Sequence, residues 1–125
     1  MNILITGASG FVGMPMLENF IKSGEVNHIY AFTRKIKDNY PRHEKLKWIE
    51  VNLVDTCKIG KIVNEYEIDA LIHLAWSDIP DFSSSKCLDN LNQSISLIET
   101  VLKNTECKKL LLAGSCFEYN QTFGE

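Results

Sequence analysis

The sequence predicts an α/β domain built on a doubly wound parallel sheet. Short apolar runs alternate with stretches in which apolar residues recur at helical spacing, and enough chain separates successive runs for crossover connections. A glycine-rich turn joins the first apolar run to the first helical stretch. The length of 125 residues suits one domain, and 45% apolar with 23% charged residues is an ordinary globular composition.

Five strands are expected from the apolar runs, which are Asn2–Thr6, His28–Thr33, Leu46–Leu53, Ile68–Ala75 and Lys108–Ala113. The fourth run is apolar almost throughout, which is typical of a parallel strand covered on both faces. The polar segment Arg34–Lys45 contains a proline and is expected to be a loop. These connections allow two strand orders, 3-2-1-4-5 and the flavodoxin-like 2-1-3-4-5.

Three helices are expected between the strands. In Phe11–Ser23 the apolar side chains fall on one helical face, and Gly24 provides a stop at the C-terminal end. Thr56–Tyr66 has the same kind of spacing. A third, longer helix is expected to begin with Ser84 or Ser85 as its cap. Its apolar residues follow a 4-3-4 spacing at Leu91, Ile95, Ile98 and Leu102.

Composition and charge argue against several classes of protein. Thirteen Lys and Arg against sixteen Asp and Glu give a net charge of −3, without the concentrated basic surface of a nucleic-acid binder. No apolar stretch approaches the roughly 18 residues that span a bilayer, and the first residues do not resemble a signal peptide. The cysteines are widely separated, so we expect reduced thiols, no metal site and a cytoplasmic location; they are Cys57, Cys87, Cys107 and Cys116.

The turn from Gly7 to Gly13 indicates a dinucleotide site. It places glycines at every third residue, directly after a strand and at the start of a helix. Gly7 would permit a sharp turn, Gly10 would let the backbone approach a pyrophosphate, and Gly13 would let the helix lie close to the strand. Free amides at the helix start would then face the anion. A glycine turn without a ligand is the alternative.

A receiver domain of flavodoxin-like order would also suit this length. Its metal site gathers carboxylates at the ends of strands. The first strand here ends in Ile5-Thr6-Gly7, without an acidic residue, so receiver chemistry is rejected.

Four further motifs follow the glycine turn, namely Asn52-Leu53-Val54-Asp55, His73-Leu74-Ala75, Asn90-Leu91 and Gly114-Ser115-Cys116-Phe117-Glu118-Tyr119. With Thr6–Gly13 they resemble the NAD(P)-dependent epimerase/dehydratase family, which comprises extended short-chain dehydrogenases/reductases that act on nucleotide sugars. The resemblance covers essentially the whole chain. It implies a Rossmann fold with strand order 3-2-1-4-5, in which residues 1–125 are the N-terminal NAD(P)-binding part of a larger enzyme.

The resemblance also implies a cofactor site and two members of a catalytic tetrad, Asn90 and Ser115. Asn52 stands where the family has Asp, and its amide oxygen could still accept from the adenine amino group. Asn120 stands where the family usually has Gly. The implied cofactor-binding residues are Gly7, Ser9, Gly10, Phe11, Val12, Gly13, Arg34, Asn52, Leu53, Leu74, Ala75 and Trp76.

Several of these residues have a purely structural alternative. His73 lies in an apolar strand, which suits a hydrogen-bonded core histidine better than a catalyst. Asp55 suits an N-cap as well as it suits a cofactor contact, and Asn90 could simply be solvated. Tyr119 is rejected as the catalytic tyrosine, because Phe123 stands where the family's Tyr-x-x-x-Lys motif has its lysine.

The end of the second expected strand favours NADP over NAD. An NAD site usually has an acidic residue there, about 20 residues after the glycine turn. This chain instead has Thr33-Arg34-Lys35. Arg34 or Lys35 could meet a 2′-phosphate, and charge-assisted contact by Arg34 favours NADP, although its guanidinium could also stack on the adenine of NAD.

In the family, a tyrosine acts as acid and base while hydride passes to or from the nicotinamide. This sequence has no Tyr-x-x-x-Lys, so we expect residues 1–125 to bind a dinucleotide without turnover. A non-catalytic NADP-sensing regulator and an interaction module with an empty glycine turn are the alternatives. Apolar surface near Leu110–Leu112 is expected to be bare and to favour self-association.

Overall fold

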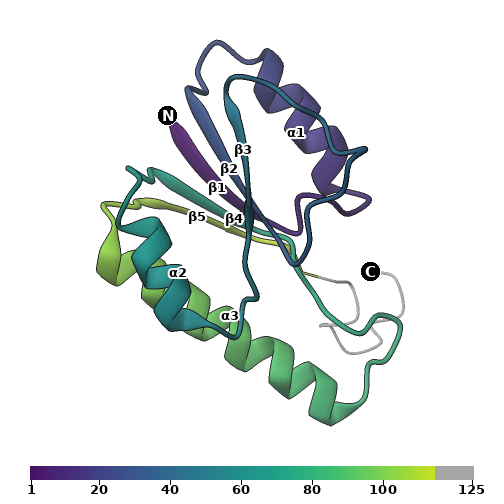
Figure 1. The fold of residues 1–125 in the computed structure, drawn as a ribbon. Helices are drawn as coiled ribbons and strands as arrows, with labels where there is room; N and C mark the ends of the chain where they lie inside the picture. The colour runs from purple at the N-terminus through teal and green to yellow at the C-terminus, as the bar shows by residue number, and fades with distance from the viewer. Residues whose placement is uncertain (115–125) are drawn as a thin grey trace, which may run out of the picture.

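Five parallel strands form one sheet in the computed structural model of the protein, which describes residues 1–114 (Figure 1). The order is β3-β2-β1-β4-β5, so the 3-2-1-4-5 order is confirmed. It differs from the flavodoxin-like order because β1 pairs with both β2 and β4. The strands are β1 (Asn2–Thr6), β2 (His28–Thr33), β3 (Leu46–Glu50), β4 (Ala70–His73) and β5 (Lys109–Leu112).

Helices cover both faces of the sheet (Figure 1). Helix α1 (Gly13–Lys22) lies on one face, and α2 (Thr56–Val63) and α3 (Ser84–Asn104) lie on the other. Because side chains alternate along a strand, β1 contributes Ile3 and Ile5 to the core under α1, and Leu4 to the core under α2 and α3. No helix within residues 1–114 is long and apolar enough to cross a membrane.

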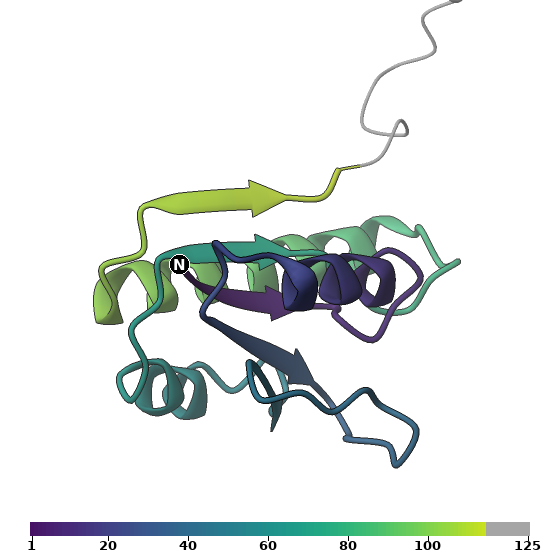
Figure 2. The ribbon, with the colours of Figure 1, turned by 90° about the horizontal axis from the view of Figure 1, so that it is seen from above.

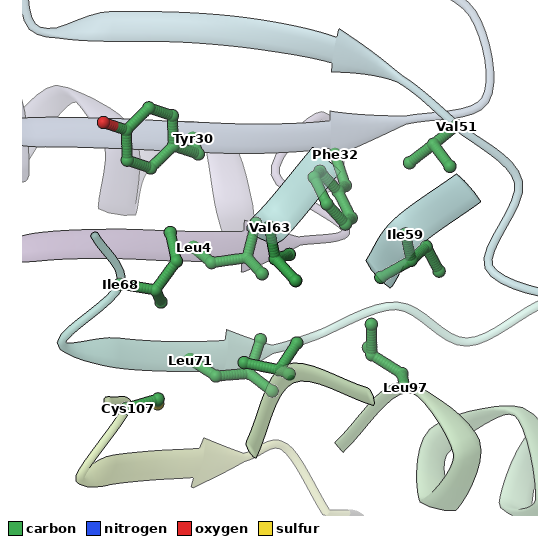
Figure 3. Packing of buried hydrophobic residues seen from close by; sticks show 11 residues of the cluster. Leu4, Tyr30, Phe32, Val51, Ile59, Val63, Ile68, Leu71, Leu97 and Cys107 are labelled. Carbon is green, nitrogen blue, oxygen red and sulfur yellow. The ribbon is translucent and has the colours of Figure 1, made fainter. Parts of the chain in front are cut away.

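The larger apolar core joins the central strands to α2 and α3 (Figure 3). Its buried members are Leu4, Tyr30, Phe32, Val51, Ile59, Val63, Ile68, Leu71, Leu97, Val101 and Cys107. This core fixes the ends of β1, β2 and β4, from which the turns and loops of the candidate site emerge.

The expected apolar stripe of α3 is not its buried face. Leu91, Ile95 and Leu102 are each about half exposed, although Ile98 packs at the edge of the core. The residues that face the sheet follow the same 4-3-4 spacing one position earlier, at Asn90, Ser94, Leu97 and Val101. Asn90 and Ser94 are polar because they form hydrogen bonds beside the cleft described below. The periodicity of the apolar residues therefore does not mark the buried face of this helix.

Several elements are shorter than the sequence predicts. Strand β3 ends at Glu50, because the chain then turns and the Asn52 carbonyl accepts from the Asp55 amide at 3.0 Å. Helix α1 begins at Gly13 instead of Phe11, and α2 ends at Val63. Helix α3 does begin at Ser84, but its N-cap is Ser83, whose side chain makes no capping bond.

Strand β5 lies at an edge of the described sheet and pairs with β4 (Figure 2). Leu110, Leu111 and Leu112 are between 46% and 52% exposed. The bare apolar surface expected at this strand is therefore present in the structure.

The assignment of the α3 face can be tested with a matched pair of substitutions. Leu97→Ala removes a fully buried side chain, so we expect it to lower the free energy of unfolding by about 2–5 kcal/mol. Leu91→Ala changes a side chain that is 52% exposed, and we expect a loss below about 1 kcal/mol. Urea unfolding followed by circular dichroism measures both, and equal losses would contradict the assignment.

Candidate functional site

A cleft of about 730 Å³ opens at the carboxyl ends of the strands, where the sheet order reverses between β1 and β4. Its size is within the usual range for ligand sites, and this position is where doubly wound sheets bind ligands. Eight of the residues expected to form the site line the cleft, namely Gly7, Ser9, Arg34, Asn52, Leu53, Ala75, Trp76 and Asn90.

The other expected residues do not line the cleft or are not described. Gly10, Phe11, Val12 and Gly13 continue the glycine turn beyond the cleft wall, and Leu74 follows β4. The Phe11 side chain is 97% exposed. Ser115 lies outside the described residues.

Gly7 and Gly13, the first and last glycines of the turn, cannot be replaced by larger residues because other backbone atoms lie close to their Cα atoms. Gly7 has a φ of +71°, and a Cβ there would lie 2.7 Å from the Ala75 amide nitrogen. A Cβ on Gly13 would lie 2.4 Å from the Gly7 carbonyl oxygen and 2.6 Å from Ala8 Cα. These contacts are shorter than any side chain permits, so the turn and the close helix follow from the absence of two Cβ atoms.

The middle of the turn leaves backbone donors free. The Gly10 amide donates to the Gly7 carbonyl at 3.0 Å. Within residues 1–114 no acceptor is recorded for the amides of Ser9, Phe11 and Val12. Unpaired amides at a helix start attract anions, and no Cβ at Gly10 blocks the approach. The residues present therefore fit the pyrophosphate of a dinucleotide.

A directed chain of hydrogen bonds runs beneath the cleft from β1 to α3. The Ser94 hydroxyl donates to the Asn90 carbonyl at 2.8 Å, so its oxygen accepts from His73 Nε2 at 2.8 Å. His73 Nδ1 then accepts from the Thr6 hydroxyl at 2.6 Å, whose oxygen accepts from the Ala75 amide at 3.4 Å.

This chain holds His73 as a neutral, hydrogen-bonded core residue. Both ring nitrogens are used, and burial lowers the pKa of His73 below its ordinary value. The structure thus supports the structural interpretation of this histidine. The hydrogen bonds of His73 connect the end of β1, where the glycine turn begins, with β4 and α3.

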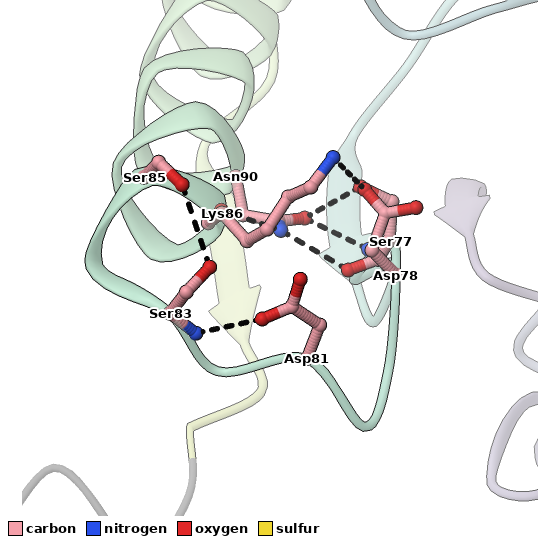
Figure 4. Close-up of polar contacts among 7 residues, drawn as sticks. All are labelled: Ser77, Asp78, Asp81, Ser83, Ser85, Lys86 and Asn90. Atoms are coloured by element: carbon pink, nitrogen blue, oxygen red, sulfur yellow. Dashed lines mark hydrogen bonds and ion pairs between the residues drawn. The ribbon is translucent and has the colours of Figure 1, made fainter.

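Asn90 is buried and fixes the loop that follows β4 (Figure 4). Its Oδ1 accepts from the Ser77 amide at 2.8 Å, and its Nδ2 donates to the carbonyls of Ser77 and Lys86 at 3.2 and 2.9 Å. Lys86 in turn forms an ion pair with Asp78 at 3.1 Å. Asn90 is therefore not merely solvated, and its side chain shapes one wall of the cleft.

In the motif after β3, one residue caps a helix and another lines the cleft. The Asp55 carboxylate accepts from the Lys58 amide at 2.9 Å and caps α2, which supports the N-cap alternative. Asn52 is exposed at the cleft, and its Oδ1 accepts from the Val54 amide at 3.3 Å. A carbonyl oxygen has two lone pairs, so Asn52 can still accept from a ligand.

Sequence reasoning missed part of the wall between β2 and β3. Arg34 and Lys35, which the sequence offers as contacts for a 2′-phosphate, both line the cleft. Thr33, Lys37 and Tyr40 line it as well and were not expected, so three cations are grouped at this end. Beyond Lys35, the segment 34–45 was interpreted only as a loop. The available signal was Tyr40, the single Phe, Tyr or Trp in that polar segment.

Comparisons with known proteins agree with this arrangement. The model of a family described as the NAD dependent epimerase/dehydratase family matches residues 3–124. The chain is 26% identical to the UDP-glucose 4-epimerase of Lactobacillus helveticus, over 95% of this chain and 37% of that protein. It is 33% identical to the dTDP-glucose 4,6-dehydratase of Haemophilus influenzae, over 82% of this chain and 32% of that protein.

A solved structure has the same fold. The Bordetella bronchiseptica enzyme WbmG, in complex with NAD, superposes with a TM-score of 0.74 at 21% identity. The match covers 90% of this chain and 36% of that one. A second structure of WbmG contains NAD and UDP. The chain thus spans about a third of the length of the curated relatives it matches.

The steric requirement for glycine at position 13 can be tested by comparing Gly13→Ala with the same substitution at Gly24, which has open space around it. Gly13→Ala forces a Cβ against the Gly7 carbonyl, and we expect a loss of at least about 2 kcal/mol in unfolding free energy. Gly24→Ala is the control, since nothing lies within 4 Å of its Cβ, and we expect a change within about 1 kcal/mol. Comparable losses in urea titrations of both variants would refute the close approach.

Protonation of His73 should couple to stability. Its folded-state pKa lies below the ordinary value of 6.5, so between these two values the unfolded chain binds a proton that the folded chain does not. The unfolding free energy should therefore fall as pH falls below 6.5, by at most about 1.4 kcal/mol per pH unit for this proton. Unfolding curves at successive pH values measure this slope, which should become shallower in His73→Gln; an unchanged slope would contradict the assignment.

Proposed function

The chain belongs to the NAD dependent epimerase/dehydratase family, and we propose that residues 1–125 form the dinucleotide-binding part of a nucleotide-sugar epimerase, dehydratase or reductase. The observation that carries this proposal is the glycine turn, where free amides meet a cleft at the switch point of the sheet. A bound nicotinamide dinucleotide supplies hydride transfer. The residues of this chain bind its pyrophosphate and orient it across the carboxyl ends of the strands.

The proposed substrate of the whole protein is a nucleotide sugar. The curated relatives are named for UDP-glucose and dTDP-glucose, and one related structure contains UDP. Ser115 and Asn90 are proposed as two members of the catalytic tetrad. Ser115 is proposed to hold the reacting oxygen, and Asn90 also keeps the loop after β4 in place. Since no Tyr-x-x-x-Lys is present, we propose that residues 1–125 alone bind dinucleotide without turnover.

A cytoplasmic location is proposed from the separated cysteines.

NADP is the proposed preferred cofactor. Arg34, Lys35 and Lys37 line the end of the cleft beside β2, where the adenosine ribose binds in such folds. Asp78, the only carboxylate among the lining residues within residues 1–114, belongs to the loop after β4. A guanidinium and two ammonium groups favour a 2′-phosphate over a ribose hydroxyl.

Titration with NADP and NAD, followed by thermal unfolding, tests the dinucleotide function. A ligand at 100 times its Kd adds about 2.7 kcal/mol to the stability of the folded state. No stabilisation by either nucleotide would contradict the proposal and favour an interaction module. Turnover of a nucleotide sugar by residues 1–125 alone would contradict catalytic incompleteness.

The cofactor preference can be tested at Arg34. Arg34→Ala removes a cation from the cleft wall, and we expect NADP affinity to fall about tenfold or more while NAD affinity changes little. Arg42→Ala is the control, because Arg42 is exposed in the same loop but does not line the cleft. Isothermal titration calorimetry gives all six dissociation constants. Tighter binding of NAD by the unaltered chain would rule out the preference.

We also propose that copies of this chain self-associate through β5, where three successive leucines are about half exposed. Sedimentation velocity should show oligomers that increase with concentration. Leu110→Lys combined with Leu112→Lys should shift the distribution towards monomer, whereas Ile36→Lys, at an exposed apolar residue elsewhere, should not. A monomer at all concentrations would contradict this proposal.

A further inference from the structure

Tyr40 is held in a fixed position between β3 and the cleft. Its ring packs against the Trp48 ring with centroids 4.4 Å apart. The Trp48 indole nitrogen donates to the Pro41 carbonyl at 2.9 Å, and the Tyr40 amide donates to the Lys37 carbonyl at 3.1 Å. The loop between β2 and β3 is therefore anchored on both sides of this tyrosine.

The hydroxyl end of Tyr40 faces polar groups of the cleft. Hydrogen bonding from the Ser9 side chain, followed by Thr33, lowers the pKa of Tyr40, and the charge of Lys37 acts in the same direction, although burial opposes them. All four residues line the cleft. The Thr33 hydroxyl donates its hydrogen to the Lys35 carbonyl at 3.2 Å, so only the Ser9 hydroxyl is left to donate to the phenol. A phenol oxygen that accepts from Ser9 can still donate its own hydrogen to a ligand.

The position of Tyr40 corresponds to one particular part of a dinucleotide. In doubly wound folds the end of β2 lies against the 2′ group of the adenosine ribose. Thr33 ends β2, and Arg34 follows it. Tyr40 and Lys37, from the loop that follows β2, line the cleft together with Thr33 and Arg34.

We propose that Tyr40 is a specificity-determining residue of the dinucleotide site, whose hydroxyl, together with Lys37, contacts the 2′-phosphate of NADP. The inference rests on the proposed dinucleotide function. A hydrogen bond to a charged phosphate is stronger than one to a ribose hydroxyl, so the contact discriminates between NADP and NAD. Packing of its ring against Trp48 holds the phenol in place for this contact.

The test compares Tyr40→Phe with Tyr66→Phe by calorimetric titration of NADP and NAD. Tyr40→Phe keeps the ring that packs on Trp48, and Trp48 fluorescence checks this packing. Tyr66 is a matched control, because its hydroxyl accepts from Lys47 at 2.5 Å and does not line the cleft. Lys37→Met, with Lys61→Met on α2 as its control, tests the second contact at an exposed position.

We expect Tyr40→Phe and Lys37→Met each to weaken NADP binding about tenfold and NAD binding less than twofold. The same variants should weaken 2′,5′-ADP but not 5′-AMP, and both controls should match the unaltered chain. Equal weakening of NADP and NAD, or no weakening, would overturn the proposal for Tyr40 while leaving the dinucleotide function intact. Binding of neither nucleotide by the unaltered chain would instead overturn the function itself.

Discussion

The close approach of three backbone segments is the constraint on which the site depends. Gly7, Gly13 and Ala75 come together so tightly that a Cβ on either glycine would lie within 2.4–2.7 Å of a backbone atom. This approach seats the start of α1 against the end of β1 and brings the chain after β4 alongside. The free amides of the turn follow from it, because a helix that begins here leaves its first donors unpaired. The anion site that we propose here is thus a product of backbone packing, with no charged side chain required.

Polar groups, in addition to the apolar core, hold the elements around the cleft in register. His73 links Thr6 of β1 to Ser94 of α3, and Asn90 one turn earlier secures the loop after β4. Buried groups of this kind must be fully hydrogen-bonded, so each fixes the position of its partners. Towards its C-terminal end the same helix face becomes apolar at Leu97 and Val101. One face of α3 therefore packs the core at one end and shapes the cleft at the other.

The two ends of the cleft have different physical characters. The glycine turn presents unpaired backbone amides, whose positions depend on the fold and tolerate little change. The wall formed by the loop between β2 and β3 consists of exposed cations and Tyr40, held by contacts with Trp48 and Pro41. Side chains on such a loop can vary without disturbing the sheet. In the proposed site, binding of the pyrophosphate and discrimination at the ribose would thereby depend on different parts of the structure.

The sequence by itself determined the sheet, the glycine turn, the strand order through its motifs, and eight of the residues that line the cleft, because these depend on local composition and spacing. Only the tertiary structure decided which face of α3 is buried. The stripe at Leu91 and the stripe at Asn90 share the same spacing, and periodicity in apolar residues cannot reveal that polar side chains face inward to pair with β4 and its loop. The tertiary structure likewise decided that Tyr40 lines the same cleft as Ser9, because the relative position of two loops depends on how the strands beneath them are arranged.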